Sequence, residues 1–74
     1  MKTKLEIFEL YKKGVQVLKP KLDKKAGNWH IEKATHDGRW VLFGLGHAYP
    51  TKVAADKYIK TLSTQLNSNY ANID

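Results

Sequence analysis

The fold is decided by the stretch WHIEKATHDGRWVLFGL, residues 29–45. Two runs rich in aromatic and β-branched residues, 29–33 and 40–45, flank His36-Asp37-Gly38, a turn signal typical of a β-hairpin. A two-residue turn at Asp37-Gly38 would scatter the apolar side chains over both faces of the hairpin. A three-residue turn, with Gly38 in the left-handed conformation, gathers them on one face. We therefore predict the three-residue turn.

This register gives the predicted hairpin two faces. One face holds the apolar residues, with Lys33 at its margin: Trp29, Ile31, Val41, Phe43 and Leu45. The other face holds His30, Glu32, Ala34, Trp40, Leu42 and Gly44. Two readings of Trp40 stay open. It is either exposed on an outer sheet face or covered by the first helix and part of the core.

Helical patterns lie on both sides of the hairpin. Residues 3–18 place apolar side chains at helical spacing after a capping box of Thr3 and Glu6, and Pro20 is expected to end this helix. Residues 19–28 then read as a lysine-rich loop. Residues 46–49 allow a short third strand, and Thr51 is a good N-cap for a closing helix to about Leu66.

This order predicts a single α+β domain over residues 1–66. It comprises an N-terminal helix, a two- or three-stranded antiparallel sheet, and a C-terminal helix packed on the sheet. Residues 67–74 are expected to form a frayed polar tail.

The charge balance favours an acidic partner. Thirteen lysines and arginines oppose seven acids, so 74 residues carry a formal net charge of +6, which attracts polyanions. The absence of cysteine excludes disulfides and thiolate metal sites. No apolar run approaches the length of a signal peptide or membrane span, so we expect a cytoplasmic protein with no membrane partner.

The sequence shows no set of residues for catalysis. The acids do not pair at spacings that suggest an acid–base couple, and the serines are not preceded by a glycine elbow. The histidines His30, His36 and His47 are not expected to converge on a metal. We expect no enzyme activity, cofactor or bound metal.

Basic residues beside an aromatic one are typical of nucleic-acid binding, because lysines attract phosphates and an exposed ring can stack or wedge. We predict a small non-catalytic protein that binds a DNA or RNA duplex. The predicted binding residues are Lys19, Lys21, Lys24, Lys25, His30, Lys33, Arg39 and Trp40. The alternative is a protein-interaction module, an inhibitor or adaptor, that binds an acidic partner through the outer sheet face or the sheet edge.

Residues 29–58 also resemble the AP2/integrase-type DNA-binding domain. The resemblance rests on Trp29-x-Ile31, Gly38-Arg39-Trp40-Val41-Leu42, Leu45-Gly46, Tyr49, Thr51 and Ala54-Ala55-x-x-Tyr58. It covers less than half of the chain and implies a three-stranded sheet packed on one helix.

In that family the outer sheet face enters the major groove with several arginines. This chain has Arg39 near that face and Glu32 on it. The α-β-β-β-α order also resembles the double-stranded-RNA-binding domain. Small domains of this kind are common in mobile elements, which makes such an element an expected source.

Overall fold

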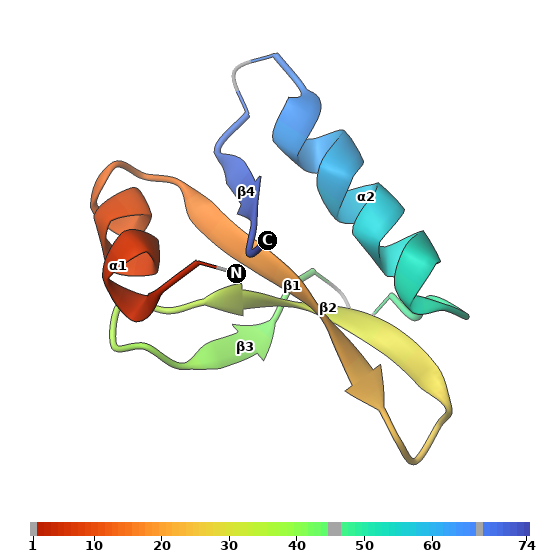
Figure 1. Cartoon of the computed structure of the whole chain (residues 1–74). Helices are drawn as coiled ribbons and strands as arrows, with labels where there is room; N and C mark the ends of the chain where they lie inside the picture. Colours follow the sequence, from red (N-terminus) through yellow and green to blue (C-terminus); the bar gives the residue numbers. More distant parts are fainter. Residues whose placement is uncertain (1, 45–46, 67) are drawn as a thin grey trace.

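The computed structural model describes residues 2–44, 47–66 and 68–74, and it confirms an α+β fold. Its elements are α1 (Lys4–Lys12), β1 (Gln16–Asp23), β2 (Asn28–Ala34), β3 (Trp40–Leu42), α2 (Lys52–Thr64) and β4 (Tyr70–Asn72). The strands form one mixed sheet in the order β3-β2-β1-β4 (Figure 1). Neighbouring strands are antiparallel except β4, which runs parallel to β1.

The predicted register between β2 and β3 is confirmed. Ala34 lies opposite Trp40 and Glu32 opposite Leu42, and Gly38 has a φ of 82° in the turn between them. The second strand of the predicted hairpin, residues 40–45, is shorter than predicted, since β3 ends at Leu42. The predicted third strand, 46–49, falls partly outside the described residues. Its described end forms an isolated bridge between Tyr49 and Trp29.

The predicted first helix is too long, because α1 ends at Lys12 instead of continuing to Leu18. Gly14 follows with a φ of 82°, and its N–H donates to the Tyr11 carbonyl at 3.0 Å. The Val15 N–H donates to the Leu10 carbonyl at 2.9 Å. This pair of bonds is a Schellman motif, which satisfies the last helical carbonyls and turns the chain away.

The predicted loop 19–28 is mostly strand, and Pro20 lies within β1 opposite Ile31. Gln16 donates its N–H to Asn69, and Leu18 accepts from Ile73, so even-numbered residues of β1 direct their backbone groups toward β4. Pro20 is the next even position, but β4 pairs only with residues 16–18. The missing N–H of Pro20 therefore removes no bond of the sheet.

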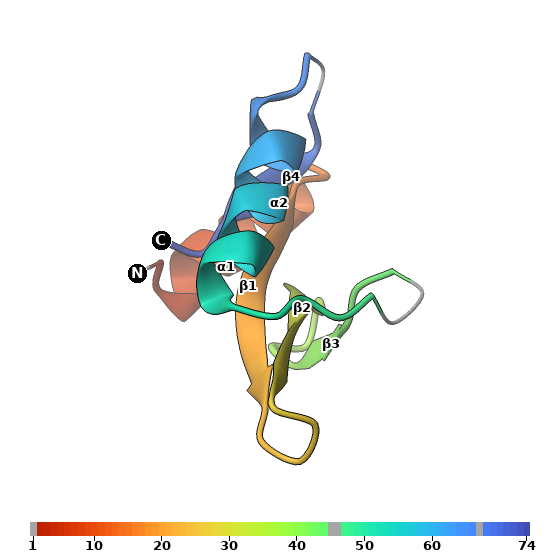
Figure 2. The same ribbon diagram turned by 90° about the vertical axis from the view of Figure 1, so that its right-hand side faces the viewer.

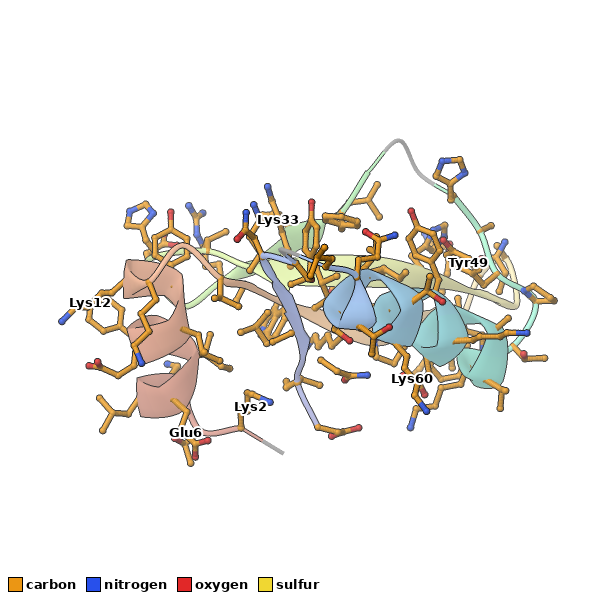
Figure 3. The ribbon with its side chains drawn as sticks, turned by 90° about the horizontal axis from the view of Figure 1, so that it is seen from above. Lys2, Glu6, Lys12, Lys33, Tyr49 and Lys60 are labelled. Carbon is orange, nitrogen blue, oxygen red and sulfur yellow. The ribbon has the colours of Figure 1, made fainter. Side chains whose placement is uncertain are left out.

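The sheet has a small core on each face, and β1 contributes to both. Leu18 is buried on the α2 side with Ile31, Ala55 and Ile59. Val17, the preceding residue, is buried on the α1 side with Ala34 and Ile73, against Ile7, Leu10 and Trp40 of the surrounding elements. The two helices lie at opposite ends of the molecule with β4 between them (Figure 3).

The closing helix is confirmed, but the end of the chain is not the expected frayed tail. The Ala54 N–H donates to the Thr51 hydroxyl at 3.1 Å, which caps α2, and α2 ends at Thr64. Residues 70–72 form β4, and the Ile73 N–H donates to the Leu18 carbonyl at 2.9 Å. Backbone pairing and burial of the Ile73 side chain hold this polar segment on the sheet.

The turn after α1 can be tested by replacing Gly14. We expect Gly14→Ala to lower the free energy of unfolding by about 1–2 kcal/mol, because a Cβ is strained at a φ of 82°. Among the described residues, no atom outside Lys13, Gly14 and Val15 lies within 4 Å of that Cβ, so the cost is conformational and not steric. Gly14→Asn should retain more of the stability, since asparagine tolerates this conformation. Urea unfolding measures the difference, and equal stability of Gly14→Ala and the wild type would contradict the glycine cap.

Candidate nucleic-acid interface

The turn end of the β1–β2 hairpin extends past both helices (Figures 1 and 2). Residues 24–27 form the turn. The distal segment 19–30 contains four lysines and a single acid, Asp23. Lys21, Lys24 and Lys25 are exposed and Lys19 is half-buried. We name segment 19–30 the basic arm, because it concentrates positive charge on a narrow projection.

Two lysines of the basic arm share one face of the sheet. Lys19 and Lys21 alternate with Leu18, Pro20 and Leu22, so they point away from the α2 side. His30 lies opposite Lys21, and Glu32 lies opposite Lys19. Lys19, Lys21 and His30 were all predicted as binding residues. They lie together on the face of the sheet that points away from α2, which we call the outer face.

The carboxylate of Asp23 is engaged within the arm. It accepts the backbone N–H of Lys25 at 3.1 Å and that of Ala26 at 3.3 Å. The Nε2 atom of His30 lies 3.4 Å from it, and the Nδ1 atom lies 3.2 Å from the His47 carbonyl. The Ala26 and Lys25 N–H groups, with His30, hold the pKa of Asp23 below its ordinary value of 3.8. Asp23 thus stabilises the turn, and its carboxylate interacts with groups of the arm itself, the Lys25 and Ala26 N–H groups and His30.

Trp40 is neither fully exposed on the outer face nor fully part of the core, the two alternatives that the sequence left open, since its side chain is half-buried. It packs on the cluster of Val17, Ala34 and Ile73 beneath α1. The Lys19 Nζ atom sits 4.2 Å from the centre of the Trp40 ring, within range of a cation–π interaction. The helix covers this end of the outer face only in part, because Leu42 remains 51% exposed.

Two predicted residues lie apart from this face. Lys33 is on the α2 side of the sheet, where it lies opposite Leu18 and Val41. Arg39 is exposed, but its Nε atom binds Asp37 at 2.8 Å within the β2–β3 turn. The Thr35 hydroxyl and the Arg39 guanidinium lower the pKa of Asp37. Arg39 is therefore a turn residue whose charge is balanced locally.

The structure adds residues of α1 that were not predicted as a site. Lys4, Leu5 and Phe8 face the β2–β3 turn and Trp40 across a groove of about 450 Å³. Lys12 places its Nζ atom 4.7 Å from the centre of the Phe8 ring. The available sequence signal was the i,i+4 spacing of Phe8 and Lys12, which puts both on one side of a helix. The partner of that side, the β2–β3 turn, could not be identified from spacing alone.

Comparison with known proteins finds no matching family model, curated protein or solved structure. Within residues 2–44, 47–66 and 68–74, no helix is long and apolar enough to span a membrane. Over the same residues, no three histidine, aspartate or glutamate side chains gather as metal ligands.

The role of Asp23 can be tested through the pH dependence of stability. Its pKa is depressed in the folded state, so its carboxylate stabilises the fold above pH 3.8 and loses that effect as the pH falls through the folded pKa. We expect the wild type to unfold at higher urea than Asp23→Asn near neutral pH, with the difference shrinking below about pH 4. A difference that stays constant over the acid range would contradict this role.

Proposed function

We propose that this protein is a non-catalytic nucleic-acid-binding protein that docks on a DNA or RNA duplex through the basic arm. The observation that supports this most directly is the concentration of four lysines on a projecting two-stranded hairpin. The one acid of that segment is engaged by backbone N–H groups and His30. A two-stranded ribbon of this kind fits the major groove of B-form DNA, and lysines on it neutralise phosphates.

This placement differs from docking by a whole sheet face, which the resemblance to the AP2/integrase-type domain implies. The α1 helix covers the outer face at Val17 and Ala34, so that end of the sheet is closed to a duplex. The turn end of the arm extends past both helices (Figure 2). In this proposal Lys19, Lys21, Lys24 and Lys25 contact phosphates. Lys33 and Arg39 are not part of the interface.

The proposal is tested by reversing the charge at the turn. We expect Lys24→Glu with Lys25→Glu to weaken duplex binding by about tenfold or more at low salt. The slope of log K against log salt should fall by about two, because two phosphate contacts are lost. Fluorescence anisotropy of labelled DNA and RNA duplexes, titrated over a range of salt, measures both quantities.

A matched control separates the position of the charge from its amount. Lys57→Glu with Lys60→Glu changes the net charge equally, on exposed positions of α2. This control should affect binding much less than the arm variant. Equal losses in the two variants would show that only the net charge attracts the duplex, and would remove the arm from the proposal.

A second candidate function, a protein-interaction module, is favoured by the exposed strand β3. This strand ends the sheet order, and its residues Val41 and Leu42 are 38% and 51% exposed. Edge strands of this kind can pair with another chain. Self-association that is detected by size-exclusion chromatography and abolished by Leu42→Ser, together with absent duplex binding, would favour this function over the first.

A further inference from the structure

The groove beside α1 has an apolar, aromatic lining that suits a flat ligand. Leu5 and Phe8 line it from the helix, and Trp40 lines it from the sheet. Leu5 is 70% exposed and Phe8 42% exposed, although both are large apolar side chains. The volume of about 450 Å³ lies within the range of small-ligand pockets. Thr35 and His36 of the β2–β3 turn add polar groups at one end.

Positive charge surrounds these apolar walls. An ammonium group lies over each ring, Lys12 over Phe8 and Lys19 over Trp40. Lys4 also lines the groove, and its side chain passes over Gly38 in the turn. The one carboxylate of the lining, Asp37, is engaged by Thr35 and Arg39. Proteins that bind single-stranded nucleic acids combine aromatic rings, on which bases stack, with positively charged groups, which attract the phosphates.

The groove and the basic arm meet at Trp40 and Lys19. Lys19 of the arm lies on the outer face of β1, and its Nζ atom is 4.2 Å from the centre of the ring of Trp40, which lines the groove. Lys21 follows on the same face toward the arm's turn. A strand whose phosphates follow these lysines therefore arrives at the groove between α1 and the β2–β3 turn.

We propose that this groove binds an unpaired nucleobase of a nucleic acid whose duplex part lies on the basic arm. This inference rests on the proposed function and gives it a preferred substrate, a duplex with a single-stranded overhang. Phe8 and Trp40 provide the apolar walls for the base. Lys4, Lys12 and Lys19 attract the adjoining phosphates. Stacking on aromatic side chains accepts every base, so the groove selects unpaired nucleotides without selecting a sequence.

Matched substrates test the proposal. Fluorescence anisotropy compares a blunt duplex with the same duplex carrying a short overhang. The wild type should bind the overhang duplex about tenfold more tightly, a gain in the range of a single base stacked on an aromatic side chain. Phe8→Ala should remove this preference while leaving affinity for the blunt duplex within about twofold, since Phe8 lies outside both buried clusters.

Two further variants serve as controls. Val53→Ala removes another exposed apolar side chain from a helix, outside the groove, and should leave the preference unchanged. Lys24→Glu with Lys25→Glu should weaken binding to both duplexes by the same factor, which keeps the preference. Equal wild-type affinity for the two duplexes, or equal losses for both in Phe8→Ala, would overturn the groove proposal. Circular dichroism verifies that each variant is folded.

The two tryptophans give a second readout that does not depend on Lys24 and Lys25 at the arm's turn. Trp40 lines the groove, whereas Trp29 packs beside the core cluster on the α2 side. Addition of a short single-stranded oligonucleotide should shift the indole N–H resonance of Trp40 and leave that of Trp29 in place. A shift of Trp40 without binding of blunt duplex would retain the groove and reject the arm. An equal shift with an acidic peptide of the same charge would overturn the preference for a base and assign the groove to a protein partner.

Discussion

The structure depends on β1 being covered on both of its faces at one end. The adjacent residues Val17 and Leu18 point to opposite sides of the sheet and are 1% and 0% exposed. A strand with apolar side chains on one face alone would need other elements packed against that face only. Here α1 covers Val17 and α2 covers Leu18, and β4 completes the sheet beside them. Chains of this length bury a modest fraction of their surface, and this one divides its core into two small clusters.

The same arrangement explains where the proposed binding surface lies. The helices and β4 contact the β1–β2 ladder mainly near Val17, Leu18 and Ala34, so its turn end has no helical cover. Charged side chains on this uncovered end remain in water and need no buried partner. Lysines therefore collect where the fold requires least burial. The charge pattern of the arm and the position of the core are two consequences of one topology.

The parts that sequence predicted well were those set by local chemistry. The β2–β3 register followed from Gly38 and the alternation around it, and the start of α2 followed from the hydroxyl of Thr51. The outer face with Lys19, Lys21 and His30 could be assembled only in part, because β1 was not recognised as a strand. Helical spacing continued through Val15 and Leu18, and Pro20 supplied an apparent stop. The deciding residue was Gly14, whose left-handed conformation ends the helix.

Contacts between distant segments were beyond prediction for a different reason. The strand β4 is short and polar, so nothing in its own sequence marks it as part of a sheet. It is held by bonds to β1 and by burial of Ile73, more than fifty residues from the Val17 that it contacts. The groove likewise joins α1 to the β2–β3 turn. Such pairings arise from the tertiary fold, and periodicity within one segment carries no information about them.

Pro20 connects the fold to the proposed function. Because it has no N–H and follows Leu18 on the β4 side, it offers no donor to a strand extending beside β1. On the other side β3 pairs with Glu32–Ala34, the Phe43 N–H donates to the Ile31 carbonyl, and Tyr49 forms a bridge to Trp29 farther along β2. The described sheet is four strands wide near its core and has two strands only beyond the Trp29–Tyr49 bridge, at the arm's turn. A two-stranded ribbon fits the major groove of B-form DNA. Pro20 therefore favours an arm that has no third strand on its β4 side, which suits the role proposed here.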